Sequence, residues 1–243
     1  MLKKFTKNLF RKLGFRISKL TKNKLVDSED GFSGIYALMK EEDRRGVFFD
    51  VGANTGQTLK TMKQYFPGGT IHSFEPGKPA FEKLQLAVTS ANIHAHNIAF
   101  GAREEQRQFN ENNFSDMSSF LPLGAHGWGE VIDQPRVKIY TIDNFCAQHG
   151  ISKINVLKSD TQGYELEVLA GATEMLKANK IQFIYLEINF VELYKDIPSF
   201  CDIYNFLIPF GYKLMRFYDF NYYEGSLGWG DALFFNPAFQ QNS

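Results

Sequence analysis

The chain has 243 residues, 44% of them hydrophobic and 15% aromatic, which is enough apolar material to build the core of one globular domain. Its two cysteines, Cys146 and Cys201, are too few for a disulfide framework and lack metal-ligand spacing, so we expect a reducing compartment, the cytoplasm. The formal net charge is zero, which disfavours a nucleic-acid-binding protein.

The charge is concentrated at the start of the chain. Residues 1–24 hold nine lysines and arginines and no acidic residue, which leaves a net charge of −9 on the rest. Residues 2–20 predict an amphipathic helix, because apolar residues recur there at spacings of three and four. Its apolar side is Leu2, Phe5, Leu9, Leu13, Ile17 and Leu20. The helix could pack on the acidic body, or it could lie peripherally on the anionic inner face of a membrane. No apolar run reaches the ~18 residues of a membrane span, and we expect no signal peptide.

We therefore divide the chain into a basic helical extension, residues 1–45, and a catalytic domain, residues 46–243. From residue 31 onwards, stretches of helical and strand character alternate. Helices are predicted at 31–43, 57–66, 79–88, 163–179 and 199–210, with a short one ending at 149. Strands are predicted at 47–51, 70–74, 92–100, 136–142, 153–160, 181–189, 211–217 and 232–235, and loop or strand at 106–121. This alternation is typical of an α/β fold with a mostly parallel sheet, helices on both faces and a final antiparallel pair of strands.

A glycine turn follows the first strand, and an acidic residue ends the second. The turn is Asp50, Val51, Gly52, Ala53, Asn54, Thr55 and Gly56. Its glycines let backbone amides approach a ligand, and the next helix N-terminus favours a carboxylate. Asp50 suits an amino group, and Glu75 suits both hydroxyls of a ribose. The pair favours S-adenosylmethionine as cofactor. The alternative is a structural turn with a capping aspartate and a helix-entry glutamate.

Two other functions are compatible with this pattern. A nicotinamide-dependent oxidoreductase would share the ribose carboxylate, but Asn54 stands where its G-x-G-x-x-G motif needs a second glycine. A non-catalytic module could keep only the cofactor pocket.

Five short motifs stand in order along the chain: DVGANTG (50–56), FEP (74–76), IAFG (98–101), LKSDTQGYELEVLAGA (157–172) and YLEIN (185–189). Together they resemble the FkbM family of S-adenosylmethionine-dependent methyltransferases over about residues 47–236. The resemblance implies a Rossmann-like class I methyltransferase fold and O-methylation of a sugar, glycan or secondary metabolite. This chain has Gln162 where glutamate is frequent in the family.

The resemblance also implies roles for individual residues. Asp50, Gly52, Asn54 and Gly56 would line the methionine end of the cofactor, and Glu75 would hold the ribose. Asn97, Ile98 and Ala99 would lie near the adenine. Asp160 would face the transferred methyl or the amino group.

Transfer to a hydroxyl also requires a group that removes a proton. Candidates are Asp160 and Glu187, at the ends of two predicted strands, and His126 in the glycine-rich loop 124–129. Asp160 could instead only bind cofactor, Glu187 could cap a loop, and His126 could face solvent. Asp160 and Glu187 could share a divalent cation, although we expect no metal.

The remaining histidines and aromatic residues have less specific patterns. We expect structural roles for His72, His94 and His96, which fall within predicted strands. Aromatic faces in a cleft would suit a sugar ring. The candidates for such faces, all in predicted loops, are Trp128, Trp229, Tyr222 and Tyr223.

Overall fold

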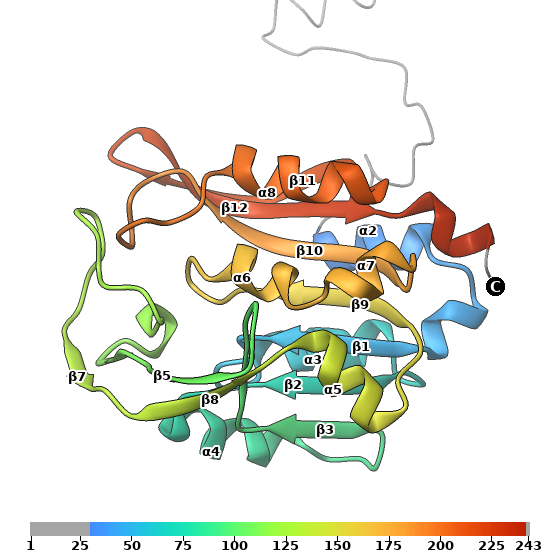
Figure 1. The fold of residues 1–243 in the computed structure, drawn as a ribbon, viewed down its shortest axis with the longest axis horizontal. Coiled ribbons are helices and arrows are strands. Elements are labelled where there is room, and N and C mark those ends of the chain that lie inside the picture. Colours follow the sequence, from blue (N-terminus) through green and yellow to red (C-terminus); the bar gives the residue numbers. More distant parts are fainter. Residues whose placement is uncertain (1–29, 242–243) are drawn as a thin grey trace, which may run out of the picture.

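The computed structural model describes residues 30–241, so the helix predicted at 2–20 lies outside the described residues. A seven-stranded sheet runs through this part of the chain in the order β11-β12-β10-β9-β1-β2-β3 (Figure 1). Its strands are β1 (Val47–Val51), β2 (Thr70–Phe74), β3 (Ile93–His96), β9 (Ile154–Ser159), β10 (Ile181–Asn189), β11 (Lys213–Tyr223) and β12 (Ser226–Phe235). Neighbouring strands from β3 to β10 are parallel, whereas β12 is antiparallel to both β10 and β11. The predicted α/β class and its antiparallel end are confirmed.

Helices cover both faces of the sheet. Those described are α2 (Gly31–Leu38), α3 (Gln57–Tyr65), α4 (Lys78–Ala87), α5 (Ile142–His149), α6 (Glu165–Ala170), α7 (Thr173–Lys177) and α8 (Phe200–Leu207). Short 3-10 turns lie at η1 (Glu42–Arg45), η2 (Ser115–Met117), η3 (Ile208–Phe210) and η4 (Pro237–Gln241). Residues of α2, α3 and α4 pack in one core cluster, and those of α5 to α8 in the other. The sheet therefore lies between two apolar layers.

Strand β1 is covered by an apolar layer on each of its two faces. Phe48 and Phe49 are both fully buried, but they belong to the two different core clusters. Phe48 stacks on Phe66, with ring centroids 4.4 Å apart. Each phenylalanine contributes about 1.5–3 kcal/mol by burial. Because consecutive side chains of a strand point to opposite faces, only a strand covered on both sides needs two such residues in a row.

Two predicted elements are divided in the structure. The strand predicted at 92–100 ends at His96, and β4 (Ala99–Phe100) then pairs with β8 (Arg136–Tyr140) in a second sheet that also contains β5 (Glu105–Gln108). Asn97 Nδ2 donates 2.9 Å hydrogen bonds to the carbonyls of Glu75 and Pro76, which tie the break between β3 and β4 to the loop after β2. The helix predicted at 163–179 breaks at Gly171, where an added Cβ would lie 2.2 Å from the Gly101 carbonyl oxygen.

The C-terminal hairpin is longer than predicted. β11 and β12 include Tyr222, Tyr223 and Trp229, which the sequence assigned to loops. Trp229 extends the sheet because it stands opposite Asn189, the last residue of β10. Of the four aromatic residues predicted in loops, only Trp128 lies outside the strands and helices.

Helix α2 lies in the segment assigned to the N-terminal extension. Its Phe32 and Ile35, and Met39 after it, pack in the same cluster as Phe48. Within residues 30–241, no helix combines the length and apolar character needed to cross a bilayer.

Candidate active site

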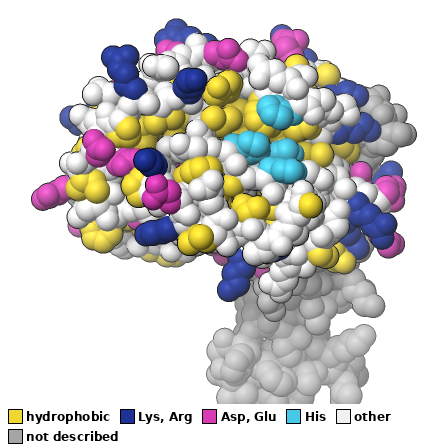
Figure 2. All heavy atoms as spheres, turned by 90° about the horizontal axis from the view of Figure 1, so that it is seen from below, with side chains coloured by type: hydrophobic (Ala, Val, Ile, Leu, Met, Phe, Trp, Pro, Cys, Tyr) yellow, Lys and Arg dark blue, Asp and Glu magenta, His cyan; other side chains and the backbone are white. Residues whose placement is uncertain are grey.

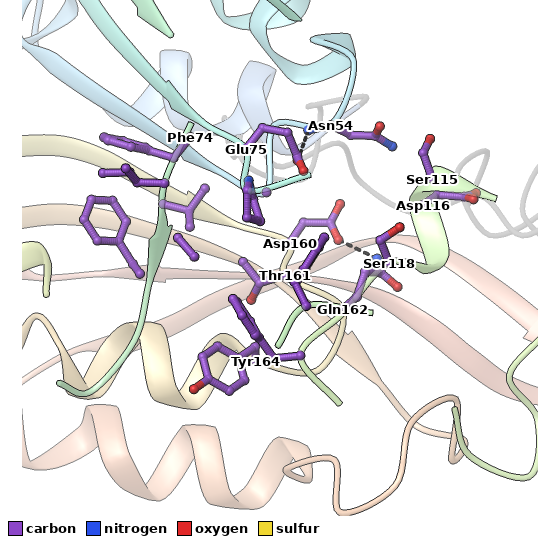
Figure 3. A pocket seen from close by; sticks show the side chains of 18 residues that line it. Asn54, Phe74, Glu75, Ser115, Asp116, Ser118, Asp160, Thr161, Gln162 and Tyr164 are labelled. Carbon is purple, nitrogen blue, oxygen red and sulfur yellow. Dashed lines mark hydrogen bonds between the residues drawn. The ribbon is translucent and has the colours of Figure 1, made fainter. Parts of the chain in front are cut away.

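A cavity opens where the carboxyl ends of β1, β2 and β9 meet, and it contains about 600 Å³ of empty space (Figure 3). The residues that line it are Val51, Gly52, Asn54, Phe74, Glu75, Pro76, Ile98, Ala99, Phe100, Phe109, Ser115, Asp116, Ser118, Phe120, Asp160, Thr161, Gln162 and Tyr164. We call it the first cavity.

The turn after β1 requires its glycine. Gly52 has a φ of +77°, and a Cβ at this position would lie 1.8 Å from the carbonyl oxygen of Asp160. Asn54 follows in the left-handed region, with a φ of +46°. Its side-chain Oδ1 is buried without a hydrogen-bond partner, and the residue lines the cavity. An unsatisfied buried acceptor is costly, so this wall is ready for a ligand that donates a hydrogen bond.

Glu75 is held in place by the backbone on either side of it. The side chain is 6% exposed. Its carboxylate accepts hydrogen bonds from the amides of Asn54 (2.8 Å) and Gly77 (2.7 Å), one on each oxygen. Burial raises the pKa of Glu75 to about 7, although these two amides oppose the shift. Each oxygen keeps a lone pair for a further donor, as a ribose diol would supply.

Another wall of the first cavity is apolar and mostly aromatic: Phe74, Ile98, Phe100, Phe109 and Phe120. Phe109 and Phe120 form an edge-to-face pair, with centroids 5.0 Å apart. A polar wall at Glu75 and Asn54 facing an apolar slot matches a nucleoside, with a ribose at one end and a flat base at the other. The residues present therefore fit S-adenosylmethionine.

Seven predicted cofactor residues line this cavity: Val51, Gly52, Asn54, Glu75, Ile98, Ala99 and Asp160. Thr55 and Gly56 do not, and Gly56 caps α3 with a φ of +95°. Ala53 is buried in the core cluster of α3, and Asn97 instead holds the loop after β2. Asp50 is fully buried outside the cavity wall, with Oδ1 3.7 Å from Lys158 Nζ. Burial raises the pKa of Asp50 to about 6 against the opposing effect of Lys158.

A second cavity adjoins the first and contains about 420 Å³ of empty space. It is lined by Asp116, Met117, Trp128, Asp160, Gln162, Glu187, Leu193 and Trp229. Asp116, Asp160 and Gln162 belong to both walls, so the two cavities meet at these side chains. Figure 3 shows Asp116, Asp160 and Gln162 together on one side of the first cavity.

Gln162 connects the two predicted carboxylates. Its Nε2 donates to Asp160 Oδ1 (2.7 Å) and to Glu187 Oε1 (3.2 Å), and its Oε1 accepts from the Tyr194 hydroxyl (2.7 Å). The backbone of Gln162 is in the left-handed region, with a φ of +57°, which is uncommon for a residue other than glycine. The Ser119 hydroxyl donates to its carbonyl oxygen (2.7 Å). An amide suits this position because it can donate to both carboxylates, whereas a glutamate would add a third negative charge.

Asp160 and Glu187 have different surroundings. Asp160 Oδ2 lies 3.3 Å from Lys158 Nζ, in an ion pair that also includes Asp50. The pKa of Glu187 is raised well above its usual value, by burial first and then by the charges of Asp160 and Glu165. Asp160 is therefore the carboxylate with a paired cation, and Glu187 is the one whose protonated form is favoured by burial.

His126 lies outside both cavity walls. Its ring packs edge-to-face on Tyr223, with centroids 5.2 Å apart, and its backbone amide donates to the Glu192 carbonyl. Within residues 30–241, no group of three or more histidine, cysteine, aspartate or glutamate side chains is arranged to hold a metal ion.

The other histidines gather at the β3 edge of the sheet, where Figure 2 shows them together on one face. His72 Nδ1 and His96 Nε2 are 3.1 Å apart, and the His72 and His94 rings stack at 4.8 Å. His149 of α5 lies next to His96, with centroids 6.3 Å apart. Burial, and then the neighbouring histidines, lower the pKa of His72 to about 3 and that of His96 to about 4.

Four residues of the site had no assigned role in the sequence: Asp116, Lys158, Glu165 and Tyr194. Lys158 and Glu165 lie inside the motif at 157–172, where the alternation of strand and helix gave no reason to single them out. Glu165 is 1% exposed and accepts from the Thr161 amide (2.7 Å) and hydroxyl (3.0 Å). Asp116 comes from the short 3-10 turn η2 and Tyr194 from an irregular segment, and neither stretch carries a sequence pattern.

Comparisons with known proteins agree with this geometry. Residues 50–214 match the family model described as the methyltransferase FkbM domain. The chain is 25% identical over 173 residues to 2-O-methyltransferase NoeI of Sinorhizobium fredii, covering 66% of this chain and 70% of that protein. It is 28% identical to hexuronic acid methyltransferase AglP of Haloferax volcanii, covering 64% of this chain and 61% of that protein. It is 26% identical to 31-O-demethyl-FK506 methyltransferase FkbM of Streptomyces tacrolimicus, covering 53% of this chain and 60% of that protein.

Proposed function

Because the chain belongs to the FkbM family of S-adenosylmethionine-dependent methyltransferases, we propose that it methylates a hydroxyl oxygen of a sugar, glycan or related small molecule. The observation that carries this proposal is the meeting of two cavities at Asp160. One cavity fits a nucleoside, and the other has room for an acceptor. The names of three relatives support the acceptor class, since two act on O atoms and one on a hexuronic acid.

In this proposal the first cavity holds the donor through groups already in place. Glu75 binds the ribose, Asn54 Oδ1 accepts a hydrogen bond, and the phenylalanine slot binds the base. When bound, S-adenosylmethionine supplies a methyl carbon activated by positive sulfur. The protein has to align an acceptor oxygen with that carbon, and such positioning lowers the barrier by up to about 7–11 kcal/mol.

Asp160 orients the acceptor hydroxyl and takes its proton. One of its oxygens is fixed by Gln162 and the other by Lys158, so the carboxylate has a single orientation. Proton removal of this kind contributes about 10²–10⁴-fold in rate. Glu187, joined to Asp160 through Gln162, is the second candidate for this role. Because Lys158 and Gln162 already engage both Asp160 oxygens, we propose a mechanism without a divalent cation.

The test is Asp160→Asn, compared with Asp196→Asn on an exposed loop. We expect the Asp160 variant to lose at least about 100-fold in methyl transfer from labelled S-adenosylmethionine to a panel of glycosides. Its affinity for S-adenosylhomocysteine, measured by calorimetry, should stay within about threefold, because the ribose and base contacts remain. Turnover within a few-fold of wild type would exclude Asp160 as the base and direct attention to Glu187.

For the domain organisation we propose a cytoplasmic catalytic domain at 46–243 preceded by an extension at 1–45, whose helix α2 packs in the core of that domain. The basic segment 2–20 has two candidate positions. It packs its apolar side on the acidic body, as most amphipathic helices do, or it holds the protein peripherally at an anionic membrane surface.

A further inference from the structure

The two tryptophans of this chain, Trp128 and Trp229, line the same cavity. Their ring centroids lie 5.9 Å apart and their planes are tilted by 40°. They come from different parts of the chain, Trp128 from the loop before β7 (Val131–Asp133) and Trp229 from β12. Asn112 Nδ2 donates a 3.1 Å hydrogen bond to the Trp128 carbonyl, which ties that loop to β6 (Glu111–Asn112).

Both tryptophan rings are partly exposed. They pack with Met117, Leu193 and Tyr194 in a small hydrophobic cluster. A tilted pair of indole faces on one wall is a suitable surface for the C–H face of a ring. The hydroxyl groups of such a ring need hydrogen-bond partners, and the polar side chains of the same cavity supply them.

The ionisable side chains of this cavity wall are all acidic. The cavity wall includes Asp116, Asp160 and Glu187, and none of its lining residues is a lysine or arginine. The nearest buried cation that the structure describes is Lys158, which is already paired with Asp50 and Asp160. Carboxylates accept hydrogen bonds from hydroxyls, but they repel a further carboxylate in a site of low polarity.

At Glu187, burial and the neighbouring carboxylates favour the protonated form of the side chain. Its pKa is raised by burial and also by Asp160, Glu165 and Asp231, which surround it. A ligand carboxylate placed here would meet the same repulsion, and none of the residues lining the cavity is a lysine or arginine that could receive it.

Resting on the proposed function, we propose that this second cavity is the acceptor site and that it selects a neutral sugar ring over a uronic acid. The tryptophan pair contacts one face of the ring. Asp116, Asp160 and Gln162 bind its hydroxyls, and the target hydroxyl is the one at Asp160. This choice separates the chain from its relative whose name specifies a hexuronic acid.

The charge of the cavity can be measured without knowing the acceptor, because all tryptophan emission of the protein comes from this wall. The measurement is collisional quenching of that emission by caesium, iodide and acrylamide at low ionic strength. We expect the caesium-to-iodide ratio of quenching constants to be at least threefold higher than for N-acetyltryptophanamide. Asp116→Asn should lower this ratio. Glu82→Gln, which removes one charge from the exposed side of α4, should not. A ratio equal to that of the free tryptophan derivative would overturn the proposal.

Selectivity is tested with matched sugars on protein saturated with S-adenosylhomocysteine. Methyl glucoside and methyl galactoside are each compared with the corresponding methyl uronide, which differs only at C6. We expect the neutral member of at least one pair to change the tryptophan emission at a concentration tenfold or more below that of its uronide. Asp116→Lys should reduce this difference. Equal or tighter binding of the uronides, or no response to any glycoside, would overturn the proposal.

Calorimetry with S-adenosylhomocysteine distinguishes this failure from failure of the proposed function. If the cofactor product binds while the neutral sugars do not, the acceptor assignment is wrong and the methyltransferase proposal stands. If the cofactor product does not bind, the proposed function itself fails.

Discussion

Replacing Glu75 by glutamine tests the donor site most directly, because this carboxylate serves two partners at once. It holds the amides of Asn54 and Gly77, and it is the proposed acceptor for the ribose hydroxyls. Glutamine keeps the size of the side chain but replaces one oxygen by an NH₂ group. That group would face a backbone N–H instead of accepting from it.

Two effects follow, and each has its own magnitude. One backbone amide loses its acceptor, which costs about 1–3 kcal/mol of folding stability. A charged hydrogen bond to the ribose is also lost, which costs about 1.5–3 kcal/mol of binding, or about 10–150-fold in affinity. Both effects are expected because Glu75 is buried, so water cannot replace the lost partner.

Calorimetry with S-adenosylhomocysteine measures the binding effect, and urea denaturation measures the stability effect. Because burial holds the Glu75 pKa at about 7, the ionised acceptor forms as pH rises, and wild-type affinity should increase between about pH 6 and about pH 8. Glu75→Gln should lack this increase. Glu82→Gln, on an exposed helix surface, is the matched control. If the folded Glu75 variant binds within threefold of wild type, the ribose is held elsewhere.

Three further outcomes are expected. Gly52→Ala should abolish S-adenosylhomocysteine binding, because its Cβ would overlap the Asp160 carbonyl; normal affinity in calorimetry would contradict the geometry of the turn. For His72→Phe, we expect the free energy of unfolding to rise relative to that of wild type as the pH falls, by about 1–2 kcal/mol between about pH 7.5 and about pH 5. The reason is that His72 binds a proton in the unfolded wild-type chain but not in the folded one, where its pKa is about 3. Urea denaturation measures this, His126→Phe is the control, and a pH-independent difference would refute it. Deleting residues 1–24 should leave sedimentation with anionic vesicles unchanged if segment 2–20 packs on the body, whereas a salt-sensitive loss of sedimentation would establish the membrane position.

The sequence predicted best what periodicity and fixed spacing encode. The strands at 47–51, 70–74 and 181–189 have the predicted boundaries, and all three lie in the interior of the seven-stranded sheet. The glycine turn and Glu75 could be placed together because parallel strands end at one edge of a sheet.

What the sequence could not predict depends on contacts between distant segments. Asp50 precedes the turn and was expected against the cofactor, but the alternation of β1 directs its side chain toward Lys158 on the neighbouring strand. Asp116 reaches the wall from the short 3-10 turn η2, and Trp128 from irregular chain that a hydrogen bond from Asn112 holds. Trp229 was placed in a loop because the glycines beside it obscure the strand pattern.

The close contact between Gly52 and Asp160 connects the donor side of the site to the acceptor side. The amide of Gly52 donates to the Phe74 carbonyl, and the amide of Asp160 donates to the Val51 carbonyl. Backbone hydrogen bonds therefore connect the glycine turn directly to β2, which leads to Glu75, and to Asp160, the proposed base. A donor molecule bound against the turn therefore lies on the same connected segments that carry Asp160. Any effect of the donor on acceptor affinity must be matched by an equal effect of the acceptor on donor affinity.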